Sequence, residues 1–151
     1  MKRSQRLEMV QNVVDGQERR RAEALAASQR RVTESEAKLM ELQSYHESYV
    51  RGFAVRAESG IDGRLARDYQ AFLARLEEAL RQQQQIVIRA RAQRDSEMQI
   101  WQGAAQRAEA VGQMVRRFQT EEARELDRRE QVESDERSAR AWTYGPVARG
   151  I

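Results

Sequence analysis

The sequence predicts an all-α protein built as a long two-helix antiparallel coiled-coil hairpin, with an overhanging C-terminal helix and a disordered tail. Three observations favour this fold class. Only one Pro occurs in 151 residues, and 34% of the residues are charged. Two long segments carry apolar residues at the three-and-four spacing of an amphipathic helix. One short segment with two glycines separates them. We expect a single hairpin domain over residues 1–141.

The first predicted helix covers about residues 3–57. Its apolar residues repeat every seven positions, which indicates a helix that packs along one seam. The series is Leu25, Val32, Leu39, His46 and Phe53, with Leu42 and Tyr49 on the companion series. Toward the N-terminus the stripe moves to Leu7, Val10 and Val14, so we expect the register to slip near residues 18–21.

Residues 58–63 form the predicted loop, because Gly60 and Gly63 permit a positive φ and Ser59 or Asp62 can cap the next helix. The second predicted helix covers about residues 64–140. Its two seam series are Tyr69, Leu76, Ala90, Ala104, Val111 and Phe118, and Leu73, Leu80, Val87, Trp101, Ala108 and Val115. Gln83, Arg94 and Glu97 interrupt these series. Two long helices joined by a short loop bury their seams most simply against each other.

An antiparallel hairpin that turns near residue 61 predicts which residues face one another. The expected pairs are Phe53 with Tyr69, His46 with Leu76, Leu25 with Glu97, and Leu7 with Val115. Residues 119 to about 140 extend past the first helix, and Leu126 and Val132 are their only large apolar residues. Residues 142–151 contain Gly145 and Pro146, which disfavour a helix, and form the predicted disordered tail.

The residue inventory argues against an enzyme. There is no Cys, and the chain has neither a glycine-rich phosphate loop nor a metal-binding His pair. We therefore expect no catalytic residues, no cofactor and no metal site. The single His46 lies on the seam, where it either sets the register or acts as a pH switch. Carboxylates such as Glu121 and Glu125 are expected on a solvated helix face.

The charge pattern also disfavours nucleic acid. Arginines at 19–21, 30 and 31 are the densest basic positions, but Glu18, Glu23 and Glu34 lie among them, and the formal net charge is only +3. No stretch approaches the ~20 apolar residues of a membrane span. We expect a soluble, cytoplasmic protein.

Aromatic residues gather near the predicted turn. Tyr45, Tyr49, Phe53, Tyr69 and Phe72 lie within a few helical turns of the loop, and two helices cannot bury them all. Two interpretations remain open at this point. The rings either clamp the loop or form a docking surface.

One segment resembles the central motif of the flagellar type III export protein family called FliJ. The motif consists of Ser59-Gly60, then residues 68–73 (Asp-Tyr-Gln-Ala-Phe-Leu), then Leu76, Ala79, Leu80 and Gln83. Trp101, Glu122 and the segments 129–131 and 135–136 are similar to residues that the family carries there. Lys38 and Gln83 depart from the residues expected at those positions.

The resemblance implies a non-enzymatic, central-stalk-like protein of bacterial flagellum biogenesis, motility and chemotaxis. Such a stalk binds the hexameric export ATPase and the membrane export gate, and the family is also linked to export chaperones. The implied location is cytoplasmic, on the inner-membrane export apparatus through partners, with the chain mostly monomeric.

The resemblance also implies two sets of contact residues. Those for the export gate are Leu42, Tyr45, Tyr49, Phe72, Leu76 and Ala79. Those for the ATPase ring are Leu7, Val10, Arg19, Arg20, Phe118, Glu122, Leu126 and Arg129. Two alternatives remain: the equivalent stalk of a virulence type III secretion system, and a generic dimerising or nucleic-acid-binding coiled coil.

Overall fold

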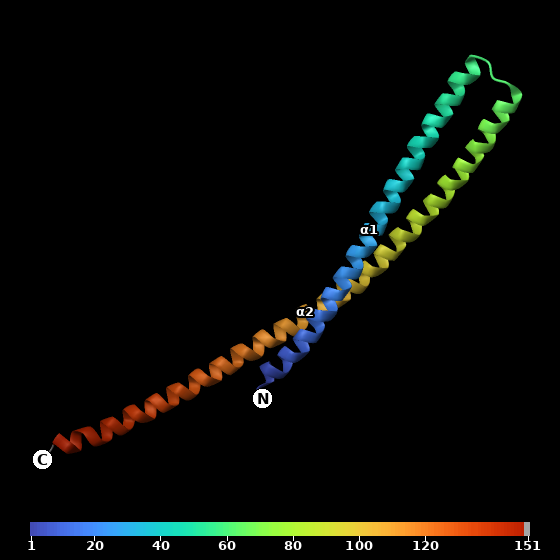
Figure 1. The fold of residues 1–151 in the computed structure, drawn as a ribbon. Coiled ribbons are helices and arrows are strands. Elements are labelled where there is room, and N and C mark those ends of the chain that lie inside the picture. The colour runs from blue at the N-terminus through green and yellow to red at the C-terminus, as the bar shows by residue number, and fades with distance from the viewer. Residues whose placement is uncertain (150–151) are drawn as a thin grey trace. The chain divides into compact units, whose positions relative to one another are not determined.

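The fold is a pair of long helices that pack against each other, as the sequence predicts. The computed structural model describes the backbone of residues 1–149 and the side chains of residues 1–143. Helix α1 spans Arg3–Glu58 and helix α2 spans Gly63–Arg149. Figure 1 shows the two helices side by side and antiparallel, joined by one short loop. The bounds of α1 and the start of α2 lie within one residue of those expected.

The loop between the helices depends on one glycine and one capping carboxylate. Gly60 has a φ of 85°, a conformation that glycine adopts without steric cost, and its N–H donates to the Ala57 carbonyl at 3.2 Å. Asp62 Oδ1 accepts a hydrogen bond from the Arg64 N–H at 2.6 Å. Asp62, one of the two candidates, is therefore the N-cap of α2.

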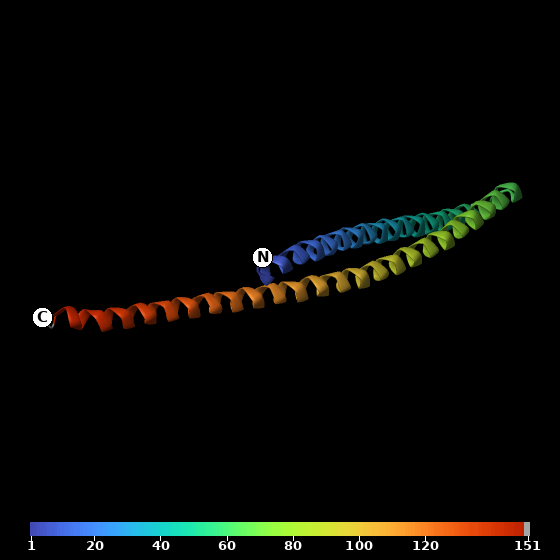
Figure 2. The ribbon, with the colours of Figure 1, turned by 90° about the horizontal axis from the view of Figure 1, so that it is seen from below.

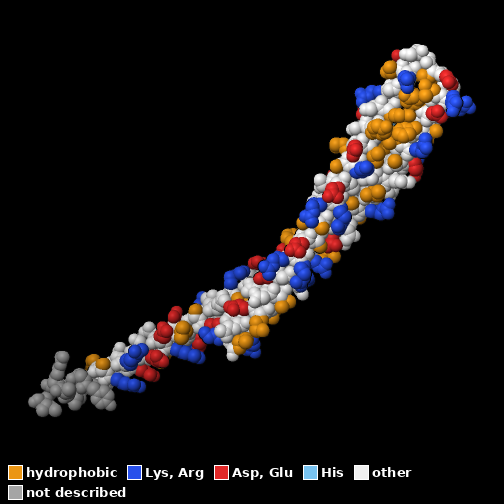
Figure 3. Space-filling view, in the orientation of Figure 1, with side chains coloured by type: hydrophobic (Ala, Val, Ile, Leu, Met, Phe, Trp, Pro, Cys, Tyr) orange, Lys and Arg blue, Asp and Glu red, His pale blue; other side chains and the backbone are white. Residues whose placement is uncertain are grey.

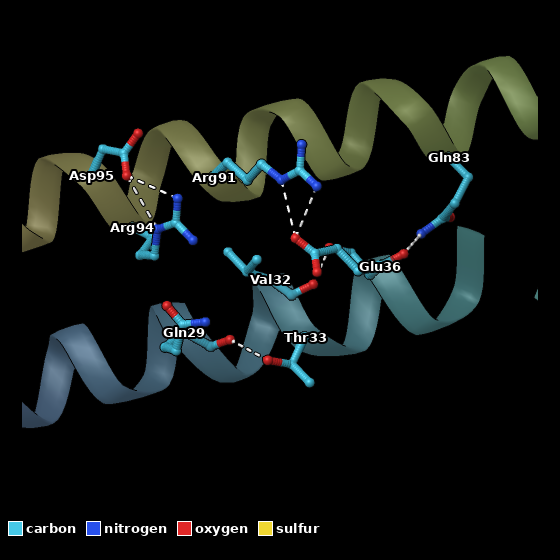
Figure 4. Close-up of polar contacts among 9 residues, drawn as sticks. Gln29, Val32, Thr33, Glu36, Gln83, Arg91, Arg94 and Asp95 are labelled. Atoms are coloured by element: carbon cyan, nitrogen blue, oxygen red, sulfur yellow. Dashed lines mark hydrogen bonds and ion pairs between the residues drawn. The ribbon is translucent and has the colours of Figure 1, made fainter. Parts of the chain in front are cut away.

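Residues Glu18–Ala104 form one compact unit that contains the closed end of the hairpin. Its core consists of Val32, Leu76, Val87 and Ala104, together with the buried hydroxyls of Ser28 and Ser35. Gln83, predicted to interrupt the seam, reaches across it and donates to the Ser35 carbonyl at 3.0 Å (Figure 4). The seam thus accommodates this polar residue, because its side-chain amide donates a hydrogen bond to a backbone carbonyl of the other helix.

Residues Met1–Gln17 and Ala105–Ile151 form the second compact unit. Ser4, Gly112 and Val115 are buried there, while Leu7 and Val14 are half-buried. Val10 is exposed, so its assignment to the packed stripe was wrong. The α1 residues that pack here recur every three or four positions: Ser4, Leu7, Gln11 and Val14. Val10 lies beside this stripe on the helix surface.

Helix α2 continues beyond the first residues of α1 (Figure 2). Every described side chain from residue 123 to residue 143 is exposed, and we call this segment the overhang. The helix runs on to Arg149, later than the expected end near residue 140, and it includes Pro146, which has no N–H to donate to the carbonyl of residue 142. Of the predicted disordered tail, 142–151, the side chains of 144–151 lie outside the described residues.

Candidate docking surfaces

The aromatic residues near the loop form a connected cluster across the two helices. The ring centroids of Tyr49 and Phe72 are 4.6 Å apart, and those of Tyr49 and Tyr69 are 5.1 Å apart. Phe53 and Tyr69 are also 5.1 Å apart, which confirms the expected pairing of these two residues. Tyr45 meets Phe72 edge-on at 6.3 Å. Such tilted and edge-on pairs are the favoured aromatic geometries.

The five rings of the cluster are not equally exposed to solvent. Tyr49, Phe53, Tyr69 and Phe72 are half-buried, whereas the side chain of Tyr45 is 52% exposed. Burial raises the pKa of the Tyr49 phenol, and the neighbouring Tyr69 and Tyr45 raise it further. Figure 3 shows hydrophobic side chains gathered near the closed end of the hairpin. As expected, the two helices do not bury all five rings.

The predicted gate-contact residues occupy different depths in this region. Tyr45, Tyr49 and Phe72 are brought together by their ring contacts. Leu42 and Ala79 are half-buried, and Leu76 lies in the core between the helices. Leu76 thus lies beneath the other five residues, and Tyr45 is the one exposed residue of the six. We call Leu42, Tyr45, Tyr49, Phe72 and Ala79 the tip patch.

A second candidate surface lies where the first turn of α1 packs against α2. The Ser4 hydroxyl donates to Glu122 Oε2 at 2.6 Å, and the Ser4 backbone N–H donates to Glu122 Oε1 at 3.2 Å. The hydrogen bond from the Ser4 hydroxyl is the main cause that lowers the pKa of the Glu122 carboxyl. The Arg3 guanidinium lies over the Phe118 ring, 5.4 Å from its centroid. These contacts fasten the first turn of α1 to α2.

A hollow of about 440 Å³ borders this junction. It is lined by Lys2, Arg3, Phe118, Glu121, Glu122, Glu125, Leu126 and Arg129. The side chain of Leu126 is 54% exposed there. Phe118 and Leu126 are its apolar lining residues, and the other six are charged, with both signs present. We call these eight residues the basal groove.

The basal groove brings together half of the predicted ATPase-contact residues. Phe118, Glu122, Leu126 and Arg129 line it, whereas Leu7 and Val10 belong to the same unit but lie outside it. Arg19 and Arg20 are exposed in the other unit. Sequence reasoning missed Lys2, Arg3, Glu121 and Glu125 as groove residues. Their charges alone resemble any solvated helix face, and only the position of the first α1 turn identifies them.

Trp101 and His46 have structural contacts inside the Glu18–Ala104 unit. The Trp101 indole N–H donates to Glu18 Oε1 at 2.8 Å, which holds the two helices together where the register was expected to slip. His46 is half-buried, and its Nε2 lies 3.5 Å from Glu77 Oε1, next to the expected partner Leu76. Both residues thus contribute polar contacts between α1 and α2.

Within the described residues there is one His and no Cys. No group of three or more His, Cys, Asp or Glu side chains is placed to hold a metal ion there. Within the same part of the chain, neither helix is apolar enough over sufficient length to cross a membrane.

The fold defines a class of protein: a coiled-coil hairpin with a partly exposed aromatic cluster near its loop and a groove where the first turn of α1 packs against α2. Comparison with known families then gives the assignment. The model of the flagellar FliJ protein family matches residues 2–145, and the chain belongs to that family. No curated protein and no solved structure matches the chain. The family connects the protein to flagellar protein export.

Proposed function

We propose that this chain is the non-enzymatic stalk of a flagellar type III export apparatus. In this proposal the basal groove and the overhang bind the ring of the export ATPase, and the tip patch binds the membrane export gate. The protein works in the cytoplasm, mostly as a monomer, and reaches the inner membrane through its partners. Its helical surfaces also receive export chaperones.

The observation that carries the proposal is the unpaired end of α2. A run of 21 described residues, 123–143, has every side chain exposed, although it continues a helix that packs against α1 up to Glu122. An isolated helix gains little stability in water, because most helical stability in proteins comes from packing. A partner that encloses this end would supply the missing contacts.

Binding alone is sufficient for the proposed role. A stalk that contacts a ring makes different contacts with different conformations of the ring subunits, and it shifts their populations by that difference in affinity. If the same rod also binds the gate, the two binding events become coupled through it. The chemistry then belongs entirely to the ATPase.

The test compares stimulation of the purified export ATPase from the same organism by wild type and by Leu126→Asp. Leu126 is exposed, so the substitution leaves the hairpin intact and places a charge in the basal groove. We expect at least about tenfold weaker binding and a matching loss of stimulation, as for the loss of a central interface residue. Val13→Asp is the control, because Val13 is equally exposed in the same unit but lies outside the groove.

A truncation after Ala123 sharpens the experiment. It removes all of the overhang except Ala123, and it keeps Glu122 and its two hydrogen bonds to Ser4. A truncation ending at Phe118 would also remove Glu122, so the effect of losing the overhang could not be distinguished from the effect of releasing the first turn of α1. Unchanged stimulation by both the truncation and Leu126→Asp would contradict the ring assignment, and a generic coiled coil would become the leading account.

The gate assignment has its own test. Tyr45→Asp is expected to weaken capture of the chain by the purified cytoplasmic part of the gate protein while ATPase stimulation stays unchanged. Val55→Asp is the matched control, since Val55 is also exposed on α1 near the loop but is not part of the tip patch. Equal capture of both variants and wild type would contradict the assignment of the tip patch.

A further inference from the structure

The charges at the start of α1 are unfavourable for a helix N-terminus. Lys2, Arg3 and Arg6 are basic, and the first turn of α1 contains no acidic residue. The N-terminal end of a helix carries a partial positive charge and N–H groups without partners in the helix, so anions stabilise it and cations destabilise it. Gln5 Oε1 accepts a hydrogen bond from the Lys2 N–H at 3.1 Å, but the Lys2 side chain has no acceptor to complete a capping box. The first turn is therefore a weak helix start by itself.

Glu122 of α2 supplies the missing cap. Its two carboxylate oxygens accept hydrogen bonds from the Ser4 N–H at 3.2 Å and from the Ser4 hydroxyl at 2.6 Å. The carboxylate thus provides both the acceptor and the negative charge that the first turn lacks. The Arg3 guanidinium adds its contact with the Phe118 ring. Helix formation in the first turn and its packing on α2 therefore depend on the same side chain.

The docked first turn also forms one wall of the basal groove. Lys2 and Arg3 line the groove from the start of α1, and its other six residues belong to α2. All three acids of the groove are on α2, whereas two of its three cations are Lys2 and Arg3. Release of the turn would leave three acids, one cation and an uncovered Phe118 ring. The docked and released states therefore present grooves of different shape and different net charge.

We propose that the first turn of α1 is a movable wall of the basal groove, that Glu122 holds this wall in place, and that the groove binds its partner only in the docked state. Helix ends open at much lower free energy than the core, so the released state is accessible. A partner that binds only the docked state has its apparent affinity reduced by the fraction of chains in that state. The inference rests on the proposed function, which assigns the export ATPase to this groove, and adds how the site is regulated.

The test measures docking and binding separately in the full chain. Hydrogen exchange of the amides of residues 6–10 reports docking, because these amides donate to the carbonyls of the first turn and the residues beside it. Titration of the purified export ATPase from the same organism reports binding. The variants are Ser4→Ala, Glu122→Ala and the two together. Glu109→Ala is the control, since it removes an exposed carboxylate of the same unit that lies outside the groove.

Each single variant should speed exchange of residues 6–10 at least tenfold and weaken ATPase binding at least fivefold, while Glu109→Ala should match wild type in both. Ser4→Ala is the decisive variant. The Ser4 side chain is buried, so a partner of the docked state cannot contact it, and a loss of binding then reports loss of docking. Because both residues act through one docked state, the double variant should lose no more affinity than the weaker-binding single variant.

Gln5→Glu in the Ser4→Ala background should restore part of the binding. It places a carboxylate in the first turn, where a negative charge stabilises the helix start, and Gln5 does not line the groove. We expect slower exchange of residues 6–10 and at least a twofold recovery of ATPase affinity relative to Ser4→Ala. Circular dichroism verifies that each variant remains helical.

Three results would overturn the inference. Unchanged exchange in Glu122→Ala would show that Glu122 does not hold the turn. Full ATPase binding by Ser4→Ala despite faster exchange would show that the groove does not need the docked turn. Additive losses in the double variant would mean that Glu122 contacts the ATPase directly.

The behaviour of wild type separates this inference from the proposed function. If wild type does not bind the ATPase, the proposed function fails and the inference fails with it. If wild type binds and any of the three results is obtained, only the inference fails.

Discussion

Small side chains occupy the closest contacts between α1 and α2. Val32 and Ser28 are almost completely inaccessible to solvent, and Val87, Ala104 and Val115 are also buried. The buried serines satisfy their hydroxyls locally: Ser28 donates to the Ala24 carbonyl at 3.1 Å and Ser35 to the Val32 carbonyl at 2.9 Å. Serine in these positions lets the helix backbones approach without an unsatisfied polar group.

Val32→Ala tests how much the seam depends on its most buried side chain. Removing two buried methyl groups and leaving a small cavity should lower the free energy of unfolding by about 2 kcal/mol. Denaturant unfolding followed by circular dichroism measures this. Val50→Ala on the same helix is the control, since Val50 is exposed and its truncation should change stability by less than about 0.5 kcal/mol. Equal effects of the two substitutions would mean that the seam differs from the one described.

The link between Ser4 and Glu122 should depend on pH. The pKa of Glu122 is lowered in the folded chain, first by the Ser4 hydroxyl, so its carboxylate stabilises the fold above the ordinary glutamate pKa of 4.5. That contribution is lost as the pH falls through the lowered pKa of the folded state. Glu122→Gln should therefore unfold at a lower temperature than wild type at pH 7, and the difference should shrink below about pH 4.

The control for this experiment is Glu121→Gln, since Glu121 is exposed and accepts no hydrogen bond from Ser4. It should melt like wild type at both pH values. A difference between Glu122→Gln and wild type that persists undiminished at pH 3 would show that Glu122 acts by packing instead of through its charge.

At the scale of the helices, the chain reversal and the unequal arms are separate features. The reversal depends on Gly60 and on the Asp62 cap, which together end α1 and start α2 within four residues. The inequality follows from length alone, since α1 has 56 residues and α2 has 87. A loop that fixes the start of α2 also determines the register of every cross-helix contact after it.

Two glycine substitutions should have opposite effects on stability. Gly60→Ala forces an L side chain into a positive φ, which costs about 1 kcal/mol. Gly52→Ala lies inside α1, where an added Cβ meets nothing within 4 Å, and should stabilise by about 0.5 to 1 kcal/mol. Thermal unfolding of the two variants measures both changes in stability. Stabilisation by Gly60→Ala would contradict the loop conformation.

At the scale of the whole chain, stability should be unevenly distributed. Core side chains occur in both compact units, while the overhang has no described side chain that is buried. Segments with few buried contacts open at low free energy, whereas core helices open only with the whole fold. The hairpin and the overhang should therefore behave as two regions of different protection.

Hydrogen exchange should distinguish these regions. In the isolated chain we expect amides of residues 123–143 to exchange within seconds, and amides of residues 69–118 to be at least about a hundredfold slower. Mass spectrometry of peptic fragments measures both. On addition of the export ATPase, the proposed stalk role predicts slower exchange in 123–143. Strong protection of the overhang in the isolated chain would instead indicate that another copy covers it.

Much of the fold could be predicted from the sequence because helical periodicity is a local property. Val32, Leu76 and Val87 each belong to a different seven-residue series that spacing along the chain predicted. The break at Gly60 and the pairing of Phe53 with Tyr69 also followed from that spacing. The exposed character of the overhang followed too, since only Leu126 and Val132 interrupt its polar residues. The FliJ motif around Tyr69 and Phe72 indicated the family, which the match over residues 2–145 established.

Only the tertiary structure decided which residues meet in three dimensions. It placed Val10 on the surface, buried Ser4 against Glu122 and assembled the basal groove from the first residues of α1 and the end of the packed part of α2. It also showed which polar side chains bridge the helices, such as Arg91, which donates to Glu36. The reason is physical: periodicity determines the face of each helix, but contact between faces depends on the register and rotation of one helix against the other.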